Sequence, residues 1–356
     1  MVSAAKLIEL AKDRSINRRR ELMNNVVDLY FQAKPQSNDR MLSMFDEVMG
    51  QLAHDLENEV RVELSHRIAL SASPPRELLR SLALDAFIDV ARPILQLSAA
   101  LEEKDLLAAT QAGGEAHLMV ISQRANLPTS VTDVIVERAS DQTLEILLSN
   151  ASAELSRAAH ERLVDRAIAH PVLHEAVVRY AKLPIDLLNE MYFIVETHLR
   201  KEIVQRNARI NPEELEEALR KSRERVTTKS RPLPEDFVRA GNKVRRAELN
   251  GALTPRSLVV FLRSGETTAY LIALSQRAGV NFDVARTVHE RRELDALSII
   301  CKAADLDRGI FVTLSVLTLG SEHNPMGRAR EFGEVYDTLP SEVARRTVRF
   351  WGGHSG

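Results

Sequence analysis

The chain has 356 residues, of which 44% are hydrophobic and only 4% aromatic, and its formal net charge is −2. This balance of charge excludes a strong general attraction to nucleic acid or to acidic membranes. The length exceeds a usual single core, and a Leu-, Ala-, Arg- and Glu-rich composition without period-two alternation predicts an all-α protein of two domains or one elongated array.

The cysteine content and the N-terminal residues indicate the compartment. The chain has one cysteine, Cys301, and a single cysteine excludes an internal disulfide framework. Because Cys301 follows two isoleucines, we expect a buried thiol in a reducing environment. Charged residues such as Lys6 and Asp13 interrupt residues 1–15, so these residues lack the apolar core of a signal peptide. No apolar run approaches the ~20 residues of a membrane span. We expect a cytoplasmic protein with no membrane partner.

Residues 1–66 are predicted to form an N-terminal helical extension. Residues 3–34 carry amphipathic spacing and end before Pro35. Ser37 or Asn38 would cap a long second helix that continues to about Ile68.

A short pattern recurs after this extension, in which an apolar residue precedes a residue that starts helices. The three regular copies are Leu127-Pro128, Leu155-Ser156 and Leu183-Pro184, where 155 − 127 and 183 − 155 both give 28. Looser copies occur at Ser73-Pro74 and Leu101-Glu102. Proline fits a first helical turn and serine caps its free amides. The period, 26 to 28 residues in these copies, predicts a HEAT-like α-solenoid of short two-helix repeats, with a first array over residues 67–205.

Residues 206–234 change in character, from an acidic-then-basic helix to a polar linker that contains two prolines. Within residues 220–246, ten lysines and arginines face only three acidic residues. This segment could bind the phosphates of nucleic acid or of a nucleotide second messenger, or it could be a solvated hinge that balances the acidic residues 213–217. The candidate binding residues here are Arg220, Lys221, Arg223, Arg225, Arg245 and Arg246.

A second array is predicted over residues 235–356. The helix-start pattern returns at Leu253-Thr254-Pro255, Val280-Asn281 and Leu306-Asp307, and the tetrapeptide Ser-Gln-Arg-Ala occurs at both 122–125 and 275–278. Arg124 and Arg277 therefore hold matched positions. With neighbouring basic residues they would form a recognition strip on the concave face, or they would cover apolar surface where repeats meet. The residues of this strip are Arg124, Arg162, Arg179, Lys182 and Arg277.

Several stretches together resemble a known bacterial family, the domain of unknown function 2336 family. These stretches are Asp89 to Leu95, Ala125 to Pro128, Ser149 to Ser152 and Ala303 to Asp307. The resemblance covers roughly residues 60–320. It implies a helical-repeat fold, and it brings no established catalytic residue with it.

The motifs that carry chemistry are incomplete. Glu63 and His66 have the spacing of a helical metal pair, but a second copy is missing. Gly113-Gly114 lacks the Lys-Ser/Thr sequel of a phosphate loop. We therefore predict no catalytic residue, no cofactor and no metal ligand, and we expect that the protein is not an enzyme.

The sequence favours a regulatory scaffold or adaptor that binds another protein along one face of the solenoid. Homodimerisation through an exposed end of the stack is a further expectation. The alternatives are a nucleic-acid-binding HEAT-like protein, disfavoured by the low aromatic content, and an effector that binds a nucleotide second messenger through residues 220–246.

Overall fold

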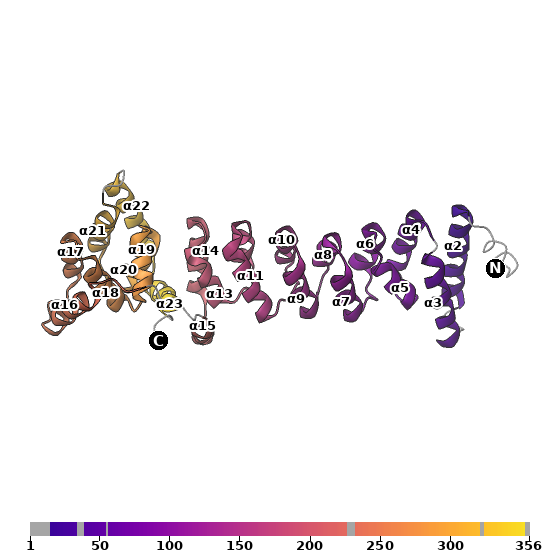
Figure 1. The fold of residues 1–356 in the computed structure, drawn as a ribbon, viewed down its shortest axis with the longest axis horizontal. Helices are drawn as coiled ribbons and strands as arrows, with labels where there is room; N and C mark the ends of the chain where they lie inside the picture. The colour runs from indigo at the N-terminus through magenta and orange to yellow at the C-terminus, as the bar shows by residue number, and fades with distance from the viewer. Residues whose placement is uncertain (1–14, 34–38, 55, 226–231, 321–323, 353–356) are drawn as a thin grey trace. The chain divides into compact units, whose positions relative to one another are not determined.

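The computed structural model describes residues 15–33, 39–54, 56–225, 232–320 and 324–352. Over these residues the chain forms α-helices and short 3-10 turns without a strand, which confirms the all-α prediction (Figure 1). The chain divides into two compact units, Met1–Lys182 and Leu183–Gly356. Each unit is described by itself.

Unit 1 is a succession of short helices. They are α2 (Ile16–Ala33), α3 (Asp39–His54), α4 (Asn58–Ala69), α5 (Arg76–Ala83), α6 (Ile88–Leu97), α7 (Glu103–Ala112), α8 (Glu115–Ser122), α9 (Thr129–Arg138), α10 (Asp141–Ser149), α11 (Arg157–Ala169), the 3-10 turn Pro171–Leu173 and α12 (His174–Arg179). The single long helix predicted up to Ile68 is wrong. Glu57 has an extended backbone and starts α4 as a separate helix. Residues 3–14 and 34 of the predicted first segment lie outside the described residues, as do Ser37 and Asn38, the predicted caps of the second helix.

Packing within unit 1 is regular. Each helix from α3 to α10 contacts the helix two positions further along the chain, and most helices of unit 1 also contact an immediate neighbour. The helices therefore follow one another along the unit in the order of the sequence (Figure 1).

The helix starts predicted from the three regular copies are confirmed. Pro128, Ser156 and Pro184 are the N-cap residues of the next helices, and the Ser156 hydroxyl accepts the amide of Ala159 at 3.1 Å. Of the looser copies, Glu102 is the N-cap residue of α7, whereas α5 starts one residue later than predicted, after Pro75. The leucine before each cap is buried: Leu127, Leu155 and Leu183 are 3%, 8% and 2% exposed. These leucines are therefore core residues next to each helix start.

Unit 2 contains α13 (Ile185–Glu190), the 3-10 turn Met191–Phe193, α14 (Thr197–Arg209), α15 (Pro212–Arg225), α16 (Phe237–Leu249), α17 (Pro255–Arg263), α18 (Thr267–Ala278), α19 (Phe282–Glu290), α20 (Leu294–Ala303), α21 (Arg308–Leu319), α22 (Pro325–Thr338) and α23 (Ser341–Gly352). The predicted caps Thr254, Asn281 and Asp307 each start a helix here. Asp307 accepts the amide of Ile310 at 2.9 Å.

Two helices form the core of unit 2. Nearly every side chain of α18 and α20 is buried, because α16, α17 and α19 cover α18 while α19, α21, α22 and α23 cover α20. Cys301 on α20 is fully buried, as the sequence suggests. Residues 183–205, which the sequence places in the first array, group with unit 2, since α14 packs on α23. Of the predicted linker, residues 226–231 lie outside the described part.

Candidate functional site

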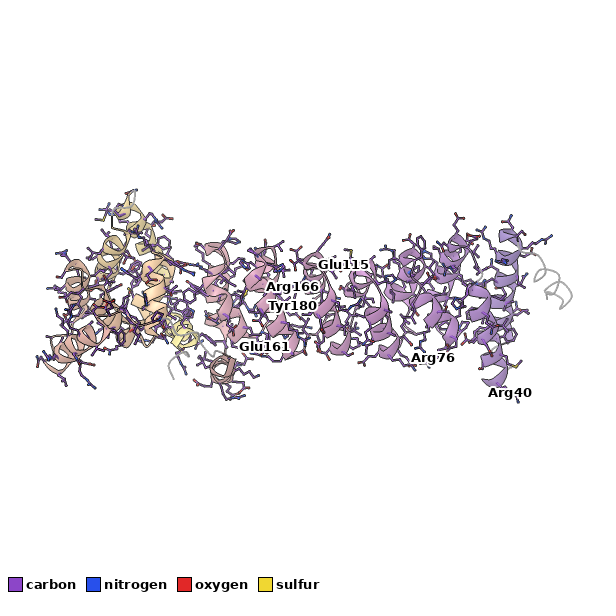
Figure 2. All side chains as sticks on the ribbon, in the orientation of Figure 1. Arg40, Arg76, Glu115, Glu161, Arg166 and Tyr180 are labelled. Carbon is purple, nitrogen blue, oxygen red and sulfur yellow. The ribbon has the colours of Figure 1, made fainter. Side chains whose placement is uncertain are left out.

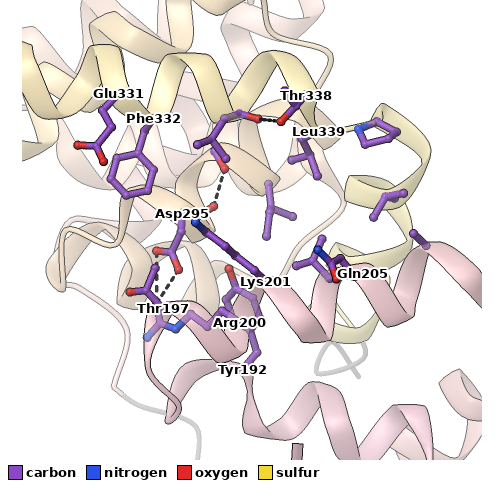
Figure 3. A pocket seen from close by; sticks show the side chains of 17 residues that line it. Tyr192, Thr197, Arg200, Lys201, Gln205, Asp295, Glu331, Phe332, Thr338 and Leu339 are labelled. Carbon is purple, nitrogen blue, oxygen red and sulfur yellow. Dashed lines mark hydrogen bonds and ion pairs between the residues drawn. The ribbon is translucent and has the colours of Figure 1, made fainter. Parts of the chain in front are cut away.

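The best candidate site is a groove in unit 2 between α14, α20, α22 and α23, with a volume of about 530 Å³ (Figure 3). Its walls are mainly aliphatic. The apolar lining residues are Val204, Ala208, Ile299, Phe332, Val335, Leu339, Pro340 and Val343. We call this the α14–α22 groove.

A cluster of polar groups closes one end of the α14–α22 groove. The Arg200 guanidinium donates to Asp295 at 3.0 Å and to Glu293 at 3.1 Å, and it lies over the ring of Tyr192 at 5.4 Å. Burial alone would lower the pKa of Arg200, but the two carboxylates outweigh burial and raise it. Burial raises the pKa of the Tyr192 phenol well above its ordinary value, and Asp295 adds to that rise. The charges of this cluster are therefore paired with one another.

The rim of the groove carries polar side chains that could bind a ligand. Lys201, Gln205 and Glu331 line the groove and are exposed, and none of the three has a polar partner among the residues that the structure describes. A ligand in the groove would contact the aliphatic walls, and on the rim it would meet the positive charge of Lys201 and the negative charge of Glu331.

The elements around the groove are held in place by buried contacts. Asn207 on α14 donates to Asn189 on α13 at 2.9 Å and to Thr347 on α23 at 3.0 Å. Trp351 packs on Tyr192 with 4.7 Å between ring centroids. These contacts fix α14 relative to α23, so the groove is preformed.

The sequence prediction missed this groove, because its walls come from segments far apart in the chain. One local signal was present on α22. The buried stripe of that helix is Ala329, Gly333 and Tyr336. Phe332 and Val335 lie three residues apart outside the stripe, so α22 has a second apolar face.

The matched arginines of the two tetrapeptides bind backbone carbonyls at helix ends. Arg124 donates to the carbonyl oxygens of Leu95 at 3.0 Å and Ser98 at 2.6 Å, at the end of α6. Arg277 donates to Ala304 at 2.9 Å, at the end of α20. Thus Arg124 reaches back along the chain whereas Arg277 reaches forward. Burial lowers the pKa of the Arg124 guanidinium.

The other residues of the predicted strip have different surroundings. Arg162 is exposed and lies 3.7 Å from Glu137, and Arg179 pairs with Glu175 on its own helix. Lys182 donates to the carbonyl oxygen of Ala153 at 3.0 Å. A role of this strip in partner binding stays a prediction.

The basic segment 220–246 has two parts in the structure. Arg220 and Lys221, on α15, hydrogen-bond to Glu217 and hold the pKa of that carboxyl down to about 2. Arg245 and Arg246 are exposed on α16 without a polar partner among the described residues. The side chains of Arg223 and Arg225 lie outside the described part.

Two kinds of feature are absent from the described residues. No group of three or more His, Cys, Asp or Glu side chains is arranged to hold a metal ion. None of the helices in the described ranges is both long and apolar enough to cross a bilayer.

Comparison with known proteins identifies the family. The model of the domain of unknown function 2336 family, described as an uncharacterised protein conserved in bacteria, matches residues 90–349. The match covers most of the chain, so the chain belongs to this family. No curated protein and no solved structure matches the chain significantly.

Proposed function

We propose that this member of the domain of unknown function 2336 family is a non-enzymatic adaptor, and that its α14–α22 groove binds an amphipathic helix of a partner protein. The observation that carries the proposal is the groove itself, a preformed apolar channel with Lys201 and Glu331 free on its rim. An amphipathic helix supplies apolar anchors on one face and charges beside them.

The chemistry of the groove favours a helix over a small ligand. Small-molecule sites combine apolar walls with a few polar groups that point into the pocket and orient the ligand. Here Arg200 is already bound to Asp295 and Glu293, and Thr338 donates to a backbone carbonyl of its own helix. The free polar groups are on the rim instead, where they would meet the flanks of a helix.

We also propose that the helices form HEAT-like repeats of a solenoid. Two observations support this. Each of the helix-start markers from Leu101 to Leu306 is followed by two helices, and in unit 1 each helix from α3 to α10 packs on the helix two positions later. Such repeats are commonly used as binding scaffolds. We place the adaptor in the cytoplasm, which a single buried thiol supports. Homodimerisation stays a prediction.

Site-specific photo-crosslinking tests the groove. A photoreactive amino acid at position 332, inside the groove, should form a covalent adduct with one protein in cells. Adding Val335→Asp should abolish the adduct, because binding of the partner would bury an unpaired carboxylate in the apolar wall, and that cost exceeds the binding free energy of the remaining contacts. Val335 is 41% exposed, so the variant should fold.

The matched control is Val48→Asp on α3, since Val48 is 48% exposed and lies outside the groove. This variant should keep the adduct. An adduct with nucleic acid, no adduct, or equal loss with Val48→Asp would each contradict the proposal.

A further inference from the structure

Helices α16 and α17 carry an unusual exposed surface, away from the α14–α22 groove residues. Five arginines here are exposed and have no polar partner within the described residues; they are Arg239, Arg245, Arg246, Arg256 and Arg263. Large aliphatic side chains are exposed among them. Val238 is 74% exposed, Leu249 80% and Val260 59%. We call this the α16–α17 surface.

Helix geometry groups these residues. Lys243 reaches from α16 toward the end of α17, where its ammonium lies 5.5 Å from the ring centre of Phe261. The same ammonium pairs at 2.6 Å with Glu266, the residue that precedes α18. Arg239 and Arg246 are four residues before and three residues after Lys243, so they lie on the same stripe of α16. This stripe therefore faces the side on which α17 lies.

The acidic residues nearby do not neutralise the surface. The Asp236 carboxylate accepts a hydrogen bond from Thr268 at 2.7 Å, and Glu266 is bound to Lys243. Glu235 and Glu248 are the remaining exposed acids in the described part of this segment. The arginines outnumber them and attract negative charge.

We infer that the α16–α17 surface binds an acidic amphipathic helix of a second protein. Clusters of arginine recognise acidic motifs through charge-assisted hydrogen bonds. The exposed Val238 and Leu249 would contact the apolar face of that helix, while Arg239 and Arg246 would meet its carboxylates. Charge and hydrophobicity together specify this occupant.

Two other classes of partner fit this surface less well. Single-stranded nucleic acid needs exposed aromatic rings for stacking, whereas Phe261 is only 7% exposed. A membrane-surface helix buries a continuous apolar face in lipid, but the apolar stripe of α16, Ala240 and Val244, is buried within unit 2.

Fluorescence anisotropy with the full chain tests the inference. The probe is a labelled synthetic helical peptide with leucines on one face and glutamates on the other. It should bind, and the double variant Arg239→Glu/Arg246→Glu should weaken binding at least about tenfold, since attraction becomes repulsion at two sites. The double variant Val238→Ser/Leu249→Ser should also weaken it, because the apolar contact is lost.

Matched controls keep the test specific. Arg40→Glu/Arg209→Glu makes the same change of charge at exposed arginines elsewhere and should leave the affinity unchanged. Val335→Asp should also leave it unchanged, so failure here and failure of the groove proposal are distinguishable. The inference is overturned if the peptide does not bind, or if both charge variants weaken binding equally. It is also overturned if a DNA duplex or phosphatidylserine vesicles bind more tightly than the peptide and lose binding with Arg239→Glu/Arg246→Glu.

Discussion

The Arg124 guanidinium shows how this protein uses many of its arginines. It donates to two carbonyl oxygens at the end of α6, where the last carbonyls of a helix have no partner within the helix. Arg138 binds Thr110 and Gly113 at the end of α7 in the same way, and Arg166 donates to Ala139 at 2.7 Å after α9. Arginine side chains from one helix pair thus donate hydrogen bonds to the free carbonyls at the C-terminal ends of helices in the preceding pair.

The substitution Arg124→Ala should therefore lower the free energy of unfolding. Two partly buried carbonyls lose their donors, which costs about 1–3 kcal/mol. Urea denaturation followed by circular dichroism measures the change. Arg162→Ala serves as the control and should cost about 0–1 kcal/mol, since its ion pair is exposed. Loss of partner binding without loss of stability in Arg124→Ala would instead support the recognition strip.

At the scale of the helix, carboxylates from one helix pair cap the next. Glu115, at the start of α8, accepts hydrogen bonds from the Ser140 amide at 3.1 Å and from the hydroxyls of Ser140 and Thr143 at the start of α10. The positive charge of Arg166 also attracts the Glu115 carboxylate; both residues are labelled in Figure 2. In a similar way Asp46 accepts the amides of Glu77 and Leu78 at the start of α5. Each of these capping carboxylates is distant in the sequence from the helix that it caps.

The pH dependence of stability should reveal the Glu115 cap. Burial raises the pKa of Glu115, but its hydrogen bonds outweigh burial and hold the pKa below the ordinary value of 4.5. The stabilisation is therefore complete above pH 4.5 and is lost as the pH falls through the folded pKa. Glu115→Gln should lower stability at neutral pH and flatten its acid dependence. Urea midpoints across an acid pH series measure both, and the exposed Glu137→Gln should keep the wild-type slope.

Helix starts with a local cap could be predicted from the sequence, because such a cap binds an amide only a few residues away. Ser156 and Asp307 show the cap and its amide partner three residues apart. The separation of α3 from α4 at Glu57 has no such local signal. The groove could not be predicted either, since Lys201 on α14 and Glu331 on α22 line it together only because α14 packs on α23 and α20 packs on both α22 and α23. The carbonyl contacts of Arg124 likewise depend on how helix pairs stack.

At the scale of a whole unit, nearest-neighbour packing dominates unit 1. Its helices contact those one or two positions away along the chain, so a local change has few routes to distant helices. Stability in such an array is approximately a sum over neighbouring interfaces.

The substitution Leu163→Ala on α11 should therefore act locally. Leu163 is fully buried, and its truncation costs about 2–5 kcal/mol. Hydrogen exchange should show faster exchange in α9 to α12 and unchanged exchange in α2 to α4. Ile168→Ala on the same helix is the control, because Ile168 is 50% exposed. Equal loss of protection along the whole unit would contradict this packing scheme.

The buried Cys301 gives the chain a practical advantage for spectroscopy. Thiol reagents attack the thiolate, and burial both shields this sulfur and raises its pKa. A cysteine introduced on the surface can thus be labelled selectively while the natural one is left in place. Pairs of fluorophores or spin labels, one on each unit, can then report the distances between them in the otherwise native chain.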